Sequence, residues 1–382
     1  MKILLTILST LIILNSCNSK ENNVLTASSE NNYISKRNLD QNNLENFNFT
    51  TEDQWDSLND ISVKQVSNKK ENVQLTSRTF GWHLPSNGSA YKNYNFSLLW
   101  GLSYFSYSIE PKTGNYKSIH QWKNSAIVDS AKANGCKIFL SVSNFGKENN
   151  ATFLANTKAQ NTLIDSLTSL LAFRNADGIN IDFEGVAKAD KDAFSNFTIQ
   201  VSQKLKKDNK NYMISLCLYA TDLHDVFDIE AIDSSIDFYT LMGYDYYGGF
   251  SSKTGPVTPF KSSKTFGNGL KSSAEYYKNK GVVYDKLIIG LPYYGAEWYT
   301  KSTEINAPVT KFKSHPAYKT IKRIYIDSLQ IPVQFDPKSA SSYLVIKDSE
   351  NSYRQIYFED EQSLSIKYDW IIKNKISGVG IW

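Results

Sequence analysis

The chain has 382 residues, enough for one large domain and additional segments. Its formal net charge is only +4, which gives no support to a nucleic-acid-binding or other polyanion-binding class. Aromatic residues make up 13% of the sequence, and they serve both in hydrophobic cores and as platforms for ligands, so this content alone does not identify a function.

The N-terminus has the pattern of an export signal. Met1-Lys2 gives a positive start, and the apolar run over residues 3–14 is too short to anchor stably across a bilayer. The run ends in Leu14-Asn15-Ser16-Cys17, which resembles a bacterial lipoprotein cleavage box with Cys17 as the acylated residue. We therefore expect a signal peptide over 1–17 and a lipid-anchored protein of the bacterial cell envelope, at the outer membrane or cell surface. An ordinary signal peptide with an incidental cysteine is the alternative.

Residues 18–75 are rich in Asn, Ser, Lys and Glu and poor in apolar residues. Such a segment cannot bury enough surface to fold alone, so we expect a disordered polar tether, with a short helix over Trp55–Val66. The remaining cysteines, Cys136 and Cys217, lie beside or within apolar runs and are expected as buried free thiols. The four histidines lack ligand spacing and no phosphate-binding glycine loop is present, so we expect neither metal nor cofactor.

From residue 76 onwards, short apolar strands alternate with helical patterns. The predicted strands are 79–84, 97–108, 137–143, 177–186, 212–219, 236–244, 287–291 and 378–382. Helical spacing marks the segments between them, for example over Trp122–Lys132. Eight strands in this order predict an α/β fold, a TIM (β/α)8 barrel over 76–382 whose site lies at the C-terminal strand ends.

The alternation breaks between residues 298 and 360. This stretch contains the strand-like runs Ile331–Phe335, Tyr343–Ile346 and Gln355–Phe358 without helices between them. A structureless loop of this length is improbable, so we expect an α+β insertion between strands seven and eight.

The fourth predicted strand carries the most informative pattern. Its apolar residues alternate with Asn180, Asp182 and Glu184, which therefore share one face. Carboxyls two residues apart on a strand are separated by roughly 7 Å, and such neighbours hold different protonation states. This is the equipment of a glycoside hydrolase. The alternative is an edge strand whose polar side faces water.

The stretch resembles the signature of glycoside hydrolase family 18, the chitinase family, which reads Asp-x-x-Asp-x-Asp-x-Glu on barrel strand four. Here the four positions are Asp177, Asn180, Asp182 and Glu184. Asn180 departs from the pattern, which by itself does not indicate an inactive enzyme.

Further motifs extend the resemblance over about residues 78–382. Met242-Gly243-Tyr244-Asp245 resembles the motif that ends strand six, and 290–295, with Tyr294, resembles the motif of strand seven. Strand eight ends in Trp382, which in the family forms the floor of the sugar pocket, and Trp82 lies in the first strand.

The Ser-x-Gly-Gly motif of strand three is matched only at Ser141. Ser143 and Asn144 replace the two glycines, which leaves the local loop shape open.

By this resemblance the protein is a monomeric retaining glycosidase that cleaves β-1,4-linked N-acetylglucosamine polymers, chitin or chito-oligosaccharides, with assistance from the substrate's acetamido group. Glu184 is the implied acid, while Asp182, Tyr244, Asp245, Asn180 and Asp177 complete the catalytic set. Trp382, Met242, Ser141, Tyr294 and Trp82 are the implied substrate-binding residues.

Three alternatives stay open for the function. Peptidoglycan and the N-glycan core are the alternative substrates, and a non-catalytic chitin-binding lectin is the alternative of another class.

In the family, strand eight continues into a loop and a closing helix, whereas this sequence ends at Trp382. We therefore expect the C-terminal helix to be missing and the natural protein to continue for roughly 20–30 residues.

Overall fold

The computed structural model describes residues 34–47, 49–59, 61 and 75–382, and Ile34–Trp382 form one unit. The predicted signal peptide, Cys17 and parts of the predicted tether lie outside the described residues. Within the described residues, no helix has the length and apolar character needed to cross a bilayer.

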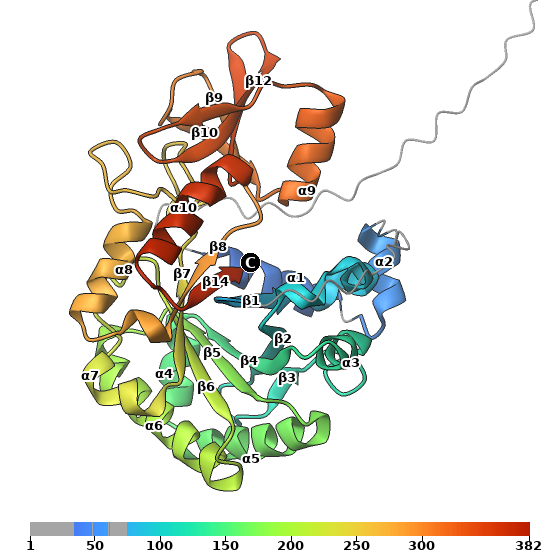
Figure 1. Ribbon diagram of the computed structural model, residues 1–382, viewed down its shortest axis with the longest axis vertical. Coiled ribbons are helices and arrows are strands. Elements are labelled where there is room, and N and C mark those ends of the chain that lie inside the picture. Colours follow the sequence, from blue (N-terminus) through green and yellow to red (C-terminus); the bar gives the residue numbers. More distant parts are fainter. Residues whose placement is uncertain (1–33, 48, 60, 62–74) are drawn as a thin grey trace, which may run out of the picture. The chain divides into compact units, whose positions relative to one another are not determined.

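Eight parallel strands form a closed barrel, as predicted (Figure 1). They are β1 (Arg78–His83), β2 (Gly101–Ile109), β4 (Lys137–Phe145), β5 (Gly178–Glu184), β6 (Met213–Leu218), β7 (Phe238–Met242), β8 (Leu287–Leu291) and β14 (Gly378–Ile381). Each strand pairs with the next, and β1 closes the barrel by pairing with both β2 and β14. A short strand, β3 (Tyr116–Ser118), pairs antiparallel with β2.

Helices cover the outside of the barrel because the strands send apolar side chains outward as well as inward. The covering helices are α3 (Ala126–Ala133), α4 (Lys147–Leu154), α5 (Thr157–Arg174), α6 (Lys191–Asp208), α7 (Ile229–Ile232), α8 (Leu270–Asn279) and α10 (Glu361–Lys373). On β5, the outward ring of Phe183 stacks on Phe194 and Phe197 of α6, with centroids 5.5 Å away in both cases. The apolar half of the β5 alternation therefore belongs to the helix–sheet core, and the polar half faces the barrel interior.

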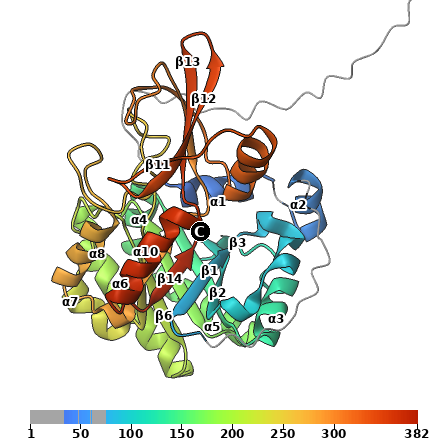
Figure 2. The same cartoon turned by 45° about the horizontal axis from the view of Figure 1, so that its top comes forward.

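The predicted insertion is a second, antiparallel sheet, confirmed between β8 and β14 (Figure 2). Its strands are β9 (Ala296–Thr300), β10 (Val309–Ser314), β11 (Gln334–Asp336), β12 (Ser341–Ser349) and β13 (Ser352–Phe358), in the order β10-β9-β13-β12-β11. The short helix α9 (Tyr318–Thr320) continues into a π-helix, Ile321–Ser328, beside this sheet. Ile321 packs with Leu344 and Ile356 in a small core of the insertion's own.

The predicted tether contains two helices, α1 (Lys36–Phe47) and α2 (Glu52–Asn59). The prediction of disorder is therefore wrong for α1 and for residues 52–54, whereas Trp55–Asn59 of α2 fall within the helix predicted over Trp55–Val66. Trp55, which is 1% exposed, packs against Phe49 at a centroid distance of 4.7 Å. The composition was misleading because these helices are stabilised by docking on the barrel. A docked helix needs only a few apolar side chains to be stable, whereas a segment that folds alone needs a core of its own.

Candidate active site

The signature strand places its polar side chains inside the barrel and at its C-terminal end. In the register of β4 and β5, Asn180 lies beside Ser141 and Asp182 beside Ser143. Asn180 and Asp182 are both fully buried, and Glu184, the last residue of β5, is 7% exposed. The two carboxyls thus stand on one face of one strand, as the alternation predicted.

The backbone of Glu184 is fixed by the first turn of α4 and the residue that precedes this helix. Its carbonyl accepts hydrogen bonds from the amide of Gly146 at 2.9 Å and from Nδ2 of Asn150 at 2.7 Å. Asn144 in turn donates to Oδ1 of Asn150 at 2.9 Å. Asn144, one of the two residues that replace the family's glycines on strand three, therefore helps to position Glu184 through Asn150.

The carboxyl of Glu184 is suited to carry a proton near neutral pH. Burial and the nearby Asp182 raise the pKa of Glu184 to about 8, against the lowering effects of a hydrogen bond from Ser35 and the charge of Arg37. Its Oε1 atom is buried without a hydrogen-bond partner among the described residues. A protonated carboxyl with a free oxygen at the strand end has the properties of a general acid.

Asp182 and Tyr244 meet on a single cation. Nη1 of Arg37 donates to Oδ2 of Asp182 at 2.7 Å, and Nε of the same guanidinium donates to the Tyr244 hydroxyl at 2.6 Å. Burial would lower the pKa of Arg37, but the Asp182 carboxylate holds it well above its ordinary value. The side chains of Asp182, from β5, and Tyr244, which follows β7, therefore contact the same guanidinium.

Asp245, directly after Tyr244, adopts a left-handed backbone conformation with φ of 57°. Its Oδ1 accepts a hydrogen bond of 2.5 Å from the Tyr294 hydroxyl, and its Oδ2 accepts one of 2.6 Å from the amide of Lys36. Burial raises the pKa of Asp245, while these two hydrogen bonds lower it. The structure thus connects the strand-six and strand-seven motifs through one carboxyl.

Two indole rings form the apolar part of the site. Trp82 and Trp382 lie with ring centroids 6.0 Å apart in an edge-to-face arrangement, and Met242 and Tyr294 belong to the same buried cluster. Trp382 also packs on Phe105 at 5.1 Å. The two indole rings therefore lie together, next to the Arg37 guanidinium that also contacts Asp182.

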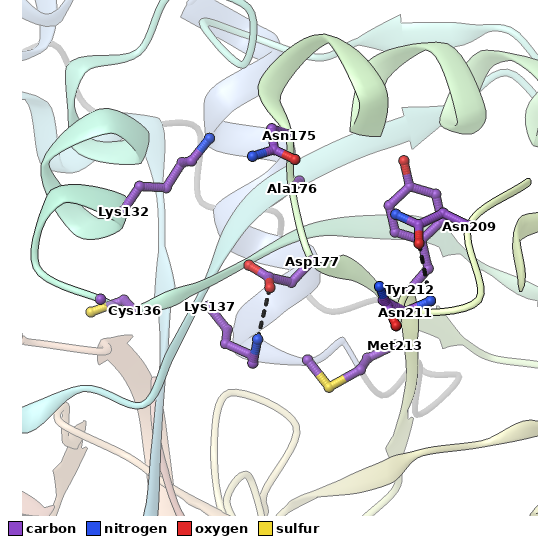
Figure 3. Close-up of a pocket in the computed structure, with 11 residues that line it drawn as sticks. Lys132, Cys136, Lys137, Asn175, Ala176, Asp177, Asn209, Asn211, Tyr212 and Met213 are labelled. Atoms are coloured by element: carbon purple, nitrogen blue, oxygen red, sulfur yellow. Dashed lines mark hydrogen bonds and ion pairs between the residues drawn. The ribbon is translucent and has the colours of Figure 1, made fainter.

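Two predicted site residues are placed elsewhere. Asp177 lies at the opposite end of β5, where it pairs with Lys137 at 2.9 Å and accepts a hydrogen bond from the amide of Ile138 (Figure 3). It lines a cavity of about 650 Å³ at that end of the barrel and is too distant to act with Glu184, so its inclusion in the catalytic set was wrong. The hydroxyl of Ser141 is buried in a 2.7 Å hydrogen bond with Ser103 inside the barrel.

Sequence reasoning missed two groups beside Asp182. Arg37 comes from α1, in the stretch predicted as disordered, and Cys217 accepts a hydrogen bond from its Nη1 at 3.2 Å. The buried residues of α1 are Arg37, Gln41 and Leu44, an i, i+4, i+7 spacing that marks one helical face and was the available signal. Cys217 follows Ser215 by two residues and so shares its inward face, which the strand alternation also indicates.

The described residues contain no group of three or more His, Cys, Asp or Glu side chains arranged to hold a metal ion.

Comparison with known proteins adds to this geometry. The sequence profile described as "Glycosyl hydrolases family 18" matches residues 101–382. A putative sporulation-specific glycosylase, YdhD, of Bacillus subtilis (strain 168) is 24% identical over 294 residues, which are 74% of this chain and 64% of that protein. The chain thus spans somewhat less than two thirds of that relative's length.

Solved structures share the fold at lower identity. A family 18 N-acetylglucosaminidase from Paenibacillus barengoltzii superposes with a TM-score of 0.70 at 18% identity, covering 80% of this chain and 95% of that one. A family 18 chitinase from Cycas revoluta, in complex with (GlcNAc)3, gives a TM-score of 0.70 at 16% identity, covering 80% and 94%.

Proposed function

This chain belongs to glycoside hydrolase family 18, and from that premise we propose that it cleaves β-1,4-linked N-acetylglucosamine polymers, chitin or chito-oligosaccharides, with retention of configuration. The observation that carries the proposal is the placement of Asp182 and Glu184 on one inward face of β5, with Tyr244 and Asp245 beside them. When two carboxyls lie side by side and burial raises the pKa of one of them, the two can take different roles, and the one with the raised pKa serves as the proton donor.

Glu184 is the proposed general acid. Its pKa of about 8 keeps it protonated near neutral pH, so it donates its proton to the leaving glycosidic oxygen and then serves as the base for water. The accompanying nucleophile is the acetamido oxygen of the substrate itself, which attacks the anomeric carbon and forms a cyclic oxazolinium ion, a known exception to the two-carboxylate scheme.

Asp182 and Tyr244 are proposed to act on that acetamido group. The Asp182 carboxylate accepts the amide hydrogen and stabilises the positive charge that develops on the ring, while the Tyr244 hydroxyl donates to the acetyl oxygen. Both groups already converge on the Arg37 guanidinium, a cationic group about as large as the acetamide, so their spacing suits such a planar guest. Stabilisation aimed at the charge of the transition state is usually the largest contribution.

The choice of substrate rests on the aromatic floor and on relatives. Trp82 and Trp382 offer rings for a sugar, and the Cycas revoluta neighbour was solved with N-acetylglucosamine oligosaccharides. Peptidoglycan and the N-glycan core carry the same sugar and remain the alternative substrates. A chitin-binding lectin would need no acid, and the retained, protonated Glu184 favours the enzyme.

The test is hydrolysis of a fluorogenic chitobioside, followed by a panel of chitin, peptidoglycan and high-mannose glycan. We expect turnover of the chitobioside and preference for chitin oligomers in the panel. Binding of chitin oligomers without turnover would favour the lectin. Chitobiose thiazoline, which mimics the cyclic intermediate, should inhibit, and a trapped covalent glycosyl–carboxylate adduct would contradict substrate assistance.

A further inference from the structure

We propose that α1 and the residue before it form an intramolecular inhibitor that fills the sugar pocket with Arg37 and has to leave before substrate binds. The inference rests on the proposed function of the same pocket. Figure 2 shows α1 lying between the barrel strands and the inserted sheet. Groups of this N-terminal segment contact the aromatic and the polar parts of the pocket.

The guanidinium of Arg37 occupies the space between the two indole rings. Its Cζ lies 4.3 Å from the ring centroid of Trp82 and 4.4 Å from that of Trp382, both within the range of cation–π contact. Trp382 is the proposed floor for the sugar being cleaved. A planar cation stacked on that face excludes a sugar ring from it.

The polar groups of the pocket are engaged by the same side chain. Arg37 is fully buried and donates to both Asp182 and Tyr244, the two residues proposed to hold the acetamido group. The guanidinium therefore stands in for the acetamido group and for the positive charge that develops there. A substrate can make these contacts only after Arg37 has withdrawn.

The adjoining residues cover the rest of the catalytic set. Ser35, which is 4% exposed, lies close enough to Glu184 for its hydroxyl to lower the pKa of that carboxyl, and the amide of Lys36 donates to Asp245 at 2.6 Å. Three consecutive residues thus contact the carboxyls or hydroxyl of all four proposed catalytic positions at the strand ends. A peptide segment bound in a groove makes contacts with consecutive residues in this way, whereas an incidental contact would involve a single residue.

The following turns of α1 hold the segment in place. Gln41 donates to the hydroxyl of Ser108 at 3.0 Å, and Glu45 accepts from the same hydroxyl at 2.6 Å. Leu44, 1% exposed, packs in the aromatic cluster that contains Trp82 and Trp382. Only three of the twelve residues of α1 are buried, so the helix is attached through a narrow face.

The fit is incomplete in a way that suits a displaceable segment. Nη2 of Arg37, Oδ1 of Asp182 and Oε1 of Glu184 are all buried without a hydrogen-bond partner among the described residues. Each such atom carries a desolvation cost that a fully matched permanent contact would avoid. A substrate that donates hydrogen bonds to these two carboxyl oxygens makes interactions that the docked segment lacks, which favours its binding over that of the segment.

Competition of this kind has a specific kinetic form. If only a fraction of the molecules has the pocket open, the apparent dissociation constant for substrate rises by the inverse of that fraction. Saturating substrate traps the open form, so kcat is unchanged and the inhibition appears entirely in KM. A structural or catalytic role of Arg37 would instead lower kcat when the side chain is removed.

The experiment compares Arg37→Ala and Leu44→Asp with the wild type, all as full chains, on a fluorogenic chitobioside. We expect both variants to lower KM by about tenfold or more while kcat stays within about a factor of two. Asn43→Ala, on the exposed side of the same helix, is the matched control and should leave both constants unchanged. A reduced kcat or an unchanged KM in Arg37→Ala overturns the inference.

A binding measurement separates this inference from the proposed reaction. In a Glu184→Gln background, calorimetry with triacetylchitotriose should give about tenfold or more tighter binding when Arg37→Ala is added. That result without hydrolysis by any variant would reject the proposed reaction and support the inhibitory segment. Equal affinity, or no binding with and without Arg37, overturns the inference because a vacated pocket has to accept the sugar.

Discussion

The indole Nε1 of Trp82 donates a hydrogen bond of 2.8 Å to Oδ1 of Asn180. The amide's other end, Nδ2, donates to the hydroxyl of Ser215 at 2.7 Å. The residue that replaces the second aspartate of the family signature is thus held at both ends inside the barrel. It links the pocket floor to β6 without adding a charge beside Asp182.

Restoring the carboxylate should change how activity responds to pH. Asn180→Asp would place a second carboxyl two residues from Asp182 on the same face of β5, and ionisation of each would be disfavoured by the other. We expect an altered acid side of the pH–rate profile with activity retained. Asn211→Asp, an exposed position at the opposite end of the barrel, adds the same charge and is the control. An unchanged profile in Asn180→Asp would show a purely structural role.

Removal of the proposed acid should abolish most turnover. Glu184→Gln keeps the size of the side chain but has no proton of suitable acidity, so kcat should fall by about 10²-fold or more. Glu230→Gln, on the exposed side of α7, should have no effect. The circular dichroism of both variants should match the wild type, and near-normal turnover in Glu184→Gln would reject the assignment.

The pH profile should fall on its alkaline side. With α1 docked, burial and Asp182 raise the pKa of Glu184 to about 8. A bound sugar also buries this carboxyl beside Asp182, so the protonated acid is present at neutral pH and is lost as the pH rises through the raised pKa. We expect kcat for a chito-oligosaccharide to decline around pH 8. An aryl chitobioside with an acidic leaving group needs less proton donation and should decline less, and identical profiles for the two substrates would argue against this role.

A buried ion pair should stabilise the junction between α10 and the insertion. Nζ of Lys367 lies 2.5 Å from Oε2 of Glu359 and also donates to the carbonyl of Ala340 at 2.8 Å, all without exposure to solvent. Lys367→Met leaves a buried carboxylate unpaired and should lower the free energy of unfolding by about 3–5 kcal/mol.

Denaturant unfolding measures this effect. Lys373→Met, an exposed lysine near the end of the same helix, should cost under about 1 kcal/mol. Changing Glu359→Leu together with Lys367→Met should recover much of the loss, since no buried charge remains unpaired. A loss in Lys367→Met no larger than in Lys373→Met would contradict the argument.

The sequence was sufficient for the barrel because its periodicities are physical requirements of the fold. The alternation in β5 separates Phe183, which packs on α6, from Asp182, which is buried in the barrel, and their placement on opposite faces was predicted from spacing alone. The inserted sheet was also predictable, because its strand-like runs lacked helices between them. Asp177 was included through the family motif alone, although seven residues of strand separate it from Glu184 by roughly 23 Å.

Arg37 could not be found by the same reasoning. The surrounding residues are polar, and the stability of α1 comes from docking on Trp82 and Asp182, which are remote in sequence. Composition measures only what a segment can bury by itself. The relation between Asn144, Asn150 and the carbonyl of Glu184 was likewise hidden, because it depends on how α4 is placed against the ends of β4 and β5.

The closure of the barrel has a consequence for how the chain folds. β1 pairs with β14, so Phe80 faces Gly380 across strands that are far apart in sequence. Contacts of such long range form late, because the loop-closure entropy has to be overcome before they contribute. Until then β1 and β14 would each present an unpaired edge, which is the part of an open sheet most prone to association. Refolding yield should therefore fall as protein concentration rises, even though the finished barrel leaves neither edge accessible.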